Sequence, residues 1–387
     1  MKNNNIHTPE GLRDIYGKEI EEKVVVQKNI MDSIRSFGYK NIQTPTFEFL
    51  EVYGKEVGST PINAMYKFCD KDGNLLALRP DFTPSIVRCA SKFYNSSHAP
   101  IRLCYMGNSF NNRANLQGRL NETTQIGAEL IGDDSIYADA EMINMAVVAL
   151  LSTGLKDFQI SICEVEYFKG LCDELLVKSD VKEELAEYIS KQNYFAAEEL
   201  LRSEGISEEN IEKILCTRQL IGNENILAKA KGTVTNEVSL GAISRLEKIY
   251  SLLCSYKVER YVSIDFSMIS KYKYYSGIIF KGYTYGIGEV IVTGGRYNKL
   301  MGQFGMDAPA IGFMCVIDNL LVAMRSQKIG ITVDENEALI LYNEENFEKA
   351  VSKQTEMRGL GYIVTLLAYS ENLKYQDAQY VEIIRLY

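Results

Sequence analysis

"FNNRANLQGRLNETTQIGAELIG", residues 110–132, decides the fold prediction because it has the pattern of two strands joined by a polar loop. Its second half places Gln125 and Glu129 four residues apart, so both side chains are expected on one face of a sheet. Buried charge is costly unless it is paired. The segment therefore predicts either a polar pocket for a ligand or pairing with Arg79 or Arg119 that fixes the strand register.

The composition is that of a globular protein. Of 387 residues, 46% are hydrophobic and 24% are charged, and the length allows two or three domains. The longest apolar run, Met145–Leu151, is far shorter than the roughly 20 residues that a membrane span requires. Residues 1–14 contain no apolar signal core. We therefore expect a cytoplasmic protein without a membrane partner.

Charge and residue counts narrow the choice of ligand. The net charge of −9 opposes binding to a polyanion, so nucleic acid is a disfavoured partner. The eight cysteines contain no CxxC pair and have no regular spacing, which is typical of buried thiols in a reducing compartment. His7 and His98 are the only histidines, which excludes a histidine-rich metal site. We expect neither a metal nor a cofactor.

The first third of the chain alternates predicted helices with short strands. Apolar residues at near-helical spacing predict a helix that ends at Gly38. Pro45 interrupts the strand that follows, which favours an edge position. A further strand leads to a turn at 79–81, and Pro84 marks the first turn of the next helix.

Residues from about 170 to 255 predict a helical module inserted into a larger domain. Leu185, Ile189, Ala196 and Leu200 are expected along one face of it. Strand patterns follow, and the apolar run from about Gly312 is predicted to be helical. The expected body consists of two parts, 1–168 and 258–330, and the helical insertion, 169–257, lies between them. A small α/β unit is expected at 331–387.

Four polar clusters interrupt strands that otherwise look buried, and they are the candidate functional groups. Each would be costly to bury without a partner. The clusters are Arg79 with Asp81 and Thr83; Arg119 with Glu122, Gln125 and Glu129; Tyr274 with Tyr275; and Gly294-Gly295-Arg296-Tyr297.

Taken together, these clusters and their surroundings resemble the histidyl-tRNA synthetase family. The match covers roughly residues 6–325, in the same order and at similar intervals, through "TPEGLRD", "LALRPDFTPSIVR", "FNNRANLQGRLNETTQIGAELIG", "YYSGIIF" and "GGRYNKL". The resemblance implies an α+β fold, in which a class II aminoacyl-tRNA synthetase-like antiparallel sheet is flanked by helices. It also implies a dimer formed through the region around 37–53.

The resemblance implies that the amino-acid side of the synthetase pocket is largely kept. Asp81 and Thr83 match the acidic residue and the threonine that bind the ammonium group, although the family has a glutamate, one methylene longer. Positions that bind the carboxylate and the imidazole, and a further arginine of the hairpin, correspond to Gln125, Glu129, Tyr274, Tyr275 and Arg119. The resemblance makes free histidine a candidate ligand of this pocket. The alternative is that these side chains simply satisfy one another.

The ATP side of the pocket departs from the synthetase pattern. Three positions that carry arginines in the family hold Asn111, Ser270 and Asn319, and the glutamate of the first motif is replaced by Arg113. Removing one electrostatic stabiliser of a transition state typically lowers a rate by ~10² to 10³. Loss of all three is expected to abolish aminoacylation and to weaken phosphate binding.

Residues 331–387 are similar to the first half of the synthetase anticodon-binding domain. With the acidic net charge, this argues against tRNA as a partner. A synthetase relative without the catalytic arginines and without a complete anticodon domain resembles the regulatory subunit family of ATP phosphoribosyltransferase. That resemblance implies a non-catalytic subunit that forms a hetero-octamer with the short-form catalytic subunit, supports the first step of histidine biosynthesis, and can transmit feedback inhibition by histidine.

Two other functions are compatible with the sequence. Arg113 lies two residues from the lost motif position and could reach a phosphate, so the chain could be a histidyl-tRNA synthetase-like amino-acid-activating enzyme. Histidine-dependent exchange of pyrophosphate into ATP would identify it. The third possibility is a stand-alone synthetase-like module in translational control, which the absence of a short-form catalytic subunit from the genome would favour.

Overall fold

The computed structural model describes residues 6–54, 60–94, 99–112, 119–269, 275–333, 336–371 and 380–387. The chain divides into two compact units, Met1–Ile331 and Thr332–Tyr387. Both candidate cavities lie in the first unit, so its sheet and helices are described first.

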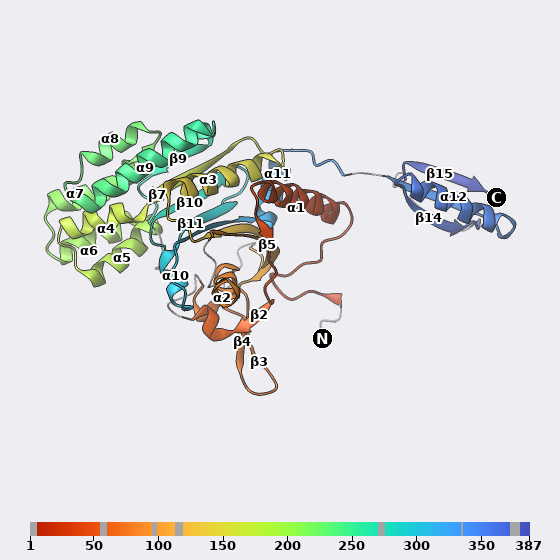
Figure 1. Ribbon diagram of the computed structural model, residues 1–387, viewed down its shortest axis with the longest axis horizontal. Helices are drawn as coiled ribbons and strands as arrows, with labels where there is room; N and C mark the ends of the chain where they lie inside the picture. Colours follow the sequence, from red (N-terminus) through yellow and green to blue (C-terminus); the bar gives the residue numbers. More distant parts are fainter. Residues whose placement is uncertain are drawn as a thin grey trace. The chain divides into compact units, whose positions relative to one another are not determined.

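A nine-stranded sheet organises the first unit (Figure 1). Its six central strands pair antiparallel throughout. Parallel pairs add one strand beyond β5 and one beyond β7. The strand order is β1 (Lys40–Asn41), β5 (Ile101–Phe110), β6 (Glu122–Ile131), β12 (Ala310–Val316), β11 (Val292–Arg296), β10 (Ile278–Thr284), β7 (Phe158–Glu164), β9 (Val262–Asp265) and β8 (Ile221–Gly222). The expected α+β fold with an antiparallel sheet flanked by helices is confirmed.

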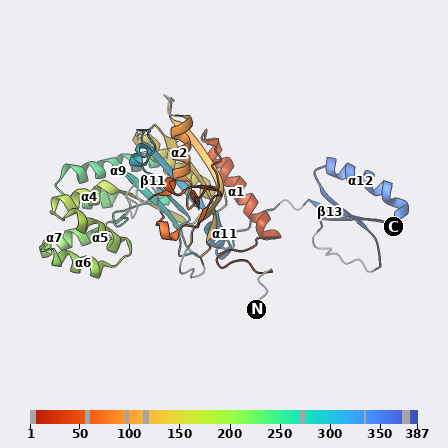
Figure 2. The same cartoon turned by 90° about the horizontal axis from the view of Figure 1, so that it is seen from below.

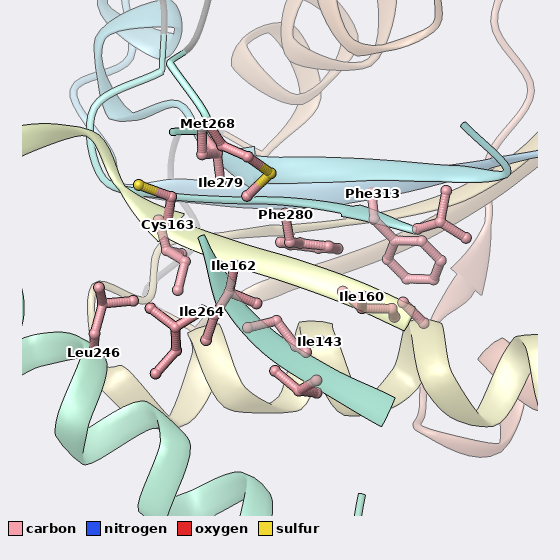
Figure 3. Close-up of a cluster of buried hydrophobic side chains, with 14 of the residues drawn as sticks. Ile143, Ile160, Ile162, Cys163, Leu246, Ile264, Met268, Ile279, Phe280 and Phe313 are labelled. Atoms are coloured by element: carbon pink, nitrogen blue, oxygen red, sulfur yellow. The ribbon is translucent and has the colours of Figure 1, made fainter. Parts of the chain in front are cut away.

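One face of the sheet carries the main hydrophobic core. Eleven of the 16 residues of α3 are buried, because this helix lies between the sheet and other helices. Figure 3 shows Ile143 of α3 and Leu246 of α9 beside Ile160, Ile162 and Ile264 of the strands. The helices that contribute to this core are α1 (Lys18–Ser36), α3 (Ile136–Leu151), α9 (Glu237–Ser255) and α11 (Ile317–Ser326).

The opposite face carries a second, smaller core, formed with α2 (Thr83–Phe93) and α10 (Asn298–Gly302). Beside α2 lies a three-stranded antiparallel sheet in the order β2 (Phe47–Phe49), β4 (Leu75–Leu78) and β3 (Lys67–Cys69). This face of the large sheet holds the candidate site.

Six helices lie between Val165 and Ser255, where the helical insertion is predicted, and both views show them gathered at one end of the sheet (Figures 1 and 2). Leu185 and Ile189 are buried as expected, but Ala197 and Leu201 are buried in place of the predicted Ala196 and Leu200. The phase changes because a new helix starts at Tyr194, with the side chain of Asn193 accepting from the backbone N–H of Ala196. The helices before α9 are α4 (Val165–Glu174), α5 (Ser179–Ser190), α6 (Tyr194–Ser203), α7 (Glu208–Leu215) and α8 (Asn225–Lys231).

The predicted helix from about Gly312 starts later than expected. Residues 310–316 form strand β12, and the helix α11 begins only at Ile317. Because β12 pairs with β6 on one side and β11 on the other, it is a central strand, and six of its seven residues are buried. A short apolar run of this kind cannot be distinguished from a buried helix by its periodicity.

In its described residues, the second unit consists of a small parallel sheet and one α-helix. Its strands are β14 (Ile363–Ala368), β13 (Glu337–Tyr342) and β15 (Glu382–Leu386), in that order, and its helix is α12 (Phe347–Gly359). The helix-like segment predicted between the last two strands falls mainly on 372–379, outside the described residues. Short 3-10 turns complete both units: Leu50–Tyr53, Ile62–Ala64, Cys216–Gln219, Glu259–Tyr261 and Glu344–Asn346. No helix in the described ranges has the length and apolar character needed to cross a membrane.

Candidate functional site

Two adjoining cavities lie on the α2 face of the large sheet. The smaller has a volume of about 50 Å³ and is centred on Glu129. The larger has a volume of about 970 Å³ and extends toward the start of α11. Residues that line both include Asp81, Tyr275 and Gly294, so the two cavities form one continuous depression.

Glu129 is the chemical centre of the smaller cavity. Its side chain is only 1% exposed. One carboxylate oxygen accepts from the Thr83 hydroxyl at 3.0 Å, and the other accepts from the Tyr297 hydroxyl at 2.5 Å. Burial raises the pKa of Glu129 to about 8, and these two hydrogen bonds only partly oppose that shift. The carboxyl group is therefore largely protonated at neutral pH.

Glycines and aromatic rings shape the walls around this acid. A Cβ atom on Gly312 would overlap the Glu129 carboxylate, and one on Gly127 would overlap the Tyr105 hydroxyl. The Tyr105 ring stacks on Phe82 with their centroids 4.5 Å apart. Burial, with the nearby Glu129 as a further cause, raises the pKa of the Tyr105 hydroxyl well above its usual value, so that hydroxyl stays neutral. These contacts form closely packed walls around the small cavity, with no space for a side chain at position 127 or 312.

The larger cavity holds polar side chains that bind the chain's own backbone. The Asn111 amide donates to the Pro80 carbonyl at 3.3 Å, and the Asn319 amide donates to the Val290 carbonyl at 2.9 Å. Gln125 also lines this cavity; it is 4% exposed, and its Oε1 has no hydrogen-bond partner among the described residues. A buried amide oxygen without a donor is rare in folded proteins.

Each arginine that lines the larger cavity in the described ranges forms an ion pair with a carboxylate of this chain. Arg119 pairs with Glu289. Arg13 lies 2.7 Å from Glu19, and Arg325 lies 3.0 Å from the same carboxylate. The positive charge of these three arginines is thus already matched internally.

Arg79 and Asp318 have structural partners. The Arg79 guanidinium stacks on Phe82, with its central carbon 4.1 Å from the ring centroid, and donates to the Asn108 carbonyl at 2.7 Å. Asp318 accepts from Lys23 of α1 at 2.7 Å and from the backbone N–H of Thr124 at 2.6 Å. The alternative in which Arg79 or Arg119 pairs with Glu129 is wrong, because the hydroxyls of Thr83 and Tyr297 take that place.

The predicted site residues divide between the two cavities. Asp81, Thr83, Glu129 and Tyr275 line the smaller one. The larger one is lined by Asn111, Arg119, Gln125 and Asn319, as well as by Asp81 and Tyr275. Tyr274, Ser270 and Arg113 lie outside the described residues. Tyr105 also lines the smaller cavity and is not among the predicted site residues. Tyr297, which lines it as well, belongs to the fourth polar cluster of the sequence, although no ligand contact is predicted for it.

No group of three or more His, Cys, Asp or Glu side chains within the described ranges is arranged to hold a metal ion. The polar groups around the smaller cavity are instead threonine and tyrosine hydroxyls and the carboxyl groups of Asp81 and Glu129. This chemistry suits an amino acid that offers hydrogen-bond donors.

The fold and the arrangement of the depression define a class II synthetase-like body. The family model for histidyl-tRNA synthetase matches residues 11–320. The solved structure of a histidyl-tRNA synthetase from Nostoc sp. PCC 7120 superposes with a TM-score of 0.81 at 20% identity, covering 97% of this chain and 88% of that one. At this identity the likeness concerns the fold alone.

More similar relatives have a narrower description. The "ATP phosphoribosyltransferase regulatory subunit" of Ruminiclostridium cellulolyticum is 38% identical over 355 residues, which covers 91% of this chain and 84% of the relative. The crystal structure of an "ATP phosphoribosyltransferase regulatory subunit/histidyl-tRNA synthetase" from Bacillus halodurans has a TM-score of 0.90 at 28% identity and covers 99% of this chain and 98% of its own. The chain belongs to the ATP phosphoribosyltransferase regulatory subunit family.

Proposed function

We propose that this chain is a non-catalytic subunit that activates a separate, short-form ATP phosphoribosyltransferase catalytic subunit in the first step of histidine biosynthesis. It would bind free histidine in the smaller cavity and so take part in feedback inhibition. The names of its relatives support the first part, and the cavity around Glu129 supports the second.

The observation that carries the non-catalytic role is the state of the larger cavity. Where the synthetase family has phosphate-binding arginines, Asn111 and Asn319 bind backbone carbonyls. The neighbouring arginines are held by Glu19 and Glu289. An ATP triphosphate would need charge-assisted hydrogen bonds that these groups do not offer.

The proposed ligand contacts follow the division of the depression. Asp81 and Thr83 would face the ammonium group, and Glu129 would face the imidazole. Gln125, Tyr275 and Arg119 complete the proposed set from the direction of the larger cavity. Tyr274, which lies outside the described residues, belongs to the set through the family resemblance. The buried Oε1 of Gln125 is available to accept a hydrogen bond from the ligand.

Self-association as a dimer is part of the proposal. Phe47 and Phe49 of β2 and Phe68 of β3 are 50%, 53% and 40% exposed, and the rings of Phe47 and Phe68 touch edge to face with centroids 5.5 Å apart. An apolar face of this kind favours a partner surface. A second copy, through the region around 37–53, is the partner that we infer, with catalytic subunits completing a hetero-octamer.

The proposed location is the cytoplasm, and tRNA is not a proposed partner. All eight cysteines are free thiols, which supports a reducing cytoplasm. The second unit carries ten Asp and Glu residues against five Lys and Arg residues, which opposes the binding of a tRNA anticodon stem.

Reconstitution with a short-form catalytic subunit tests the partner. The purified chain is expected to bind that subunit in size-exclusion chromatography and to raise the rate of phosphoribosyl-ATP formation. The chain alone should show no histidine-dependent exchange of pyrophosphate into ATP. A chain that neither associates nor changes the rate would refute the regulatory role, and measurable exchange would establish the amino-acid-activating alternative.

Calorimetry with L-histidine tests the pocket separately. Wild type should bind, and Glu129→Ala should not. Glu166→Ala, which removes an exposed carboxylate that pairs with Lys169 on α4, is the matched control and should bind like wild type. Absence of binding to wild type would leave the pocket without its proposed ligand, whatever the reconstitution gives.

A further inference from the structure

A buried charge network lies directly behind the pocket tyrosines. Asp139 of α3 is fully buried and accepts at one oxygen from Arg296, at 2.6 and 2.9 Å. Its other oxygen accepts from Arg245 of α9, at 2.5 and 2.9 Å. One carboxylate therefore links the last residue of β11 to a helix of the insertion. Glu164, at the end of β7, adds a second acid 4.0 Å from Arg245.

Arg296 holds both segments that supply pocket tyrosines. Its neighbour in sequence, Tyr297, donates to Glu129. Its backbone carbonyl accepts from the N–H of Ser276 at 2.8 Å, and its side chain covers Gly277, where a Cβ atom would lie 3.0 Å from the Arg296 Cδ. The position of Arg296 thus sets the position of Tyr275, which precedes these two residues, as well as that of Tyr297.

The Tyr275 ring depends on the same strand. A Cβ atom on Gly295 would lie 2.6 Å from the ring edge of Tyr275, so the ring lies directly across that residue. A shift of the 295–297 segment would therefore move both tyrosines that flank Glu129.

The helix that supplies Arg245 is firmly joined to the sheet. Leu246, the next residue of α9, is fully buried and lies in the main core near Ile162 and Ile264 (Figure 3). Arg245 itself also donates to the Asp134 carbonyl at 3.1 Å, and Asp134 lies 3.1 Å from Arg296. A displacement of α9 would therefore reach Arg296 by two routes, one through the Asp139 carboxylate and one through Asp134.

We infer that Arg245 is a positioning residue for the amino-acid pocket, through which the helical insertion sets ligand affinity by way of Asp139 and Arg296. This inference rests on the proposed binding of histidine and adds a route by which events at the insertion reach that site. A purely structural role would make Arg245 a stabiliser of the junction only. The two roles differ in whether the pocket segments respond when Arg245 is removed.

The test uses the full-length chain and four forms: wild type, Arg245→Ala, Arg245→Lys and Glu247→Ala. Glu247 lies two residues along α9 and pairs with Lys231 of α8 at 2.7 Å, so its removal breaks an ion pair of the insertion that does not reach Asp139. L-histidine affinity is measured by calorimetry. Hydrogen exchange is followed without ligand in the peptides that cover 275–281 and 292–298.

Arg245→Ala is expected to lower histidine affinity about tenfold, as for a typical coupling between sites, and to speed exchange in both peptides. Arg245→Lys, which keeps the charge, should recover part of the affinity, and Glu247→Ala should match wild type. Affinity and exchange in Arg245→Ala within about twofold of wild type would overturn the inference. Equal losses in Arg245→Ala and Glu247→Ala would also overturn it, since they would indicate general loosening. If wild type binds no histidine, the ligand proposal fails, and the exchange data alone decide the positioning role.

Discussion

The two cavities of the depression share walls but differ in how their polar groups are used. In the smaller cavity, Thr83 and Tyr297 both direct hydroxyls at one buried acid. In the larger cavity, Asn111 and Asn319 bind backbone carbonyls, and Arg119 binds a carboxylate of the chain itself. The smaller cavity therefore has hydroxyl groups arranged around one acid. In the larger cavity, the arginines are paired with carboxylates of the same chain.

Under the proposed function, recognition of an amino acid and chemistry on phosphates depend on separate groups, even on adjacent strands. The geometry around Glu129 depends on strand pairing and on glycines, so it does not require charged groups in the larger cavity. The proposed function follows this division, with an amino-acid site beside a cavity whose described arginines are all ion-paired. Four measurements would break or sharpen this contrast.

The largest expected effect concerns the internal charge balance near the larger cavity. Lys23→Met leaves Asp318 buried without its cation and should lower the free energy of unfolding of the first unit by about 3 to 5 kcal/mol. Lys28→Met, on the same helix, removes an exposed partner of Asp32 and should cause no measurable change. Urea unfolding followed by circular dichroism measures both. Equal effects of the two substitutions would show that the Asp318 pair carries no special weight.

The second-largest effect concerns the space available for a ligand in each cavity. Gly312→Ala places a methyl group on the Glu129 carboxylate and should weaken histidine binding at least about 100-fold. Gly288 lines the larger cavity and has no atom within 4 Å of its added Cβ, so Gly288→Ala should bind like wild type. Calorimetry distinguishes them. Binding by Gly312→Ala at wild-type strength would mean that the ligand does not use the smaller cavity.

The third effect is a pH dependence of stability. The pKa of Glu129 is about 8 in the folded protein, against 4.5 for an ordinary glutamate. Between these values the folded state holds a proton that the unfolded state has released, so stability falls as pH rises from 4.5 toward 8 and then levels. Glu129→Gln should remove about 1 to 4 kcal/mol of this fall. Thermal unfolding from pH 5 to 9 measures it, with Glu166→Gln as the control, and identical profiles for wild type and Glu129→Gln would contradict the assignment.

The smallest effect concerns Arg119. Its side chain is 47% exposed and its partner Glu289 is 37% exposed, so Arg119→Ala should change the free energy of unfolding by less than about 1 kcal/mol. Histidine affinity should fall by no more than about fivefold. Glu289→Gln frees the arginine and should keep or raise affinity. A larger loss in Arg119→Ala would contradict this ranking and make Arg119 a main contributor to ligand affinity.

Much of the body could be predicted because its signals are local. Alternation along β6 predicts that Gln125 and Glu129 share a face, and they line the adjoining cavities. The start of α11 was misplaced because β12 lies between two strands and shows no polar alternation. The phase of α6 was missed because a single capping residue, Asn193, resets the helix.

Tyr105, which the sequence does not predict, and the separate roles of Arg296 and Tyr297 depend on contacts between distant segments. Tyr105 enters the pocket only because its strand pairs it with Gly127 and because Phe82 of another segment stacks on it. Arg296 and Tyr297 are adjacent in sequence, yet the first binds Asp139 and the second binds Glu129. Nothing in the four letters of "GGRY" distinguishes these roles.

Because Glu129 is protonated at neutral pH, ligand binding in this pocket is coupled to protonation. A neutral acid must release its proton before it can pair with a positively charged imidazole, whereas it can itself donate to a neutral one. Protons and cationic ligand would then compete for one carboxyl group, and the heat of binding would depend on the ionisation enthalpy of the buffer. Under the proposed function, each binding of histidine would then be coupled to the uptake or release of protons.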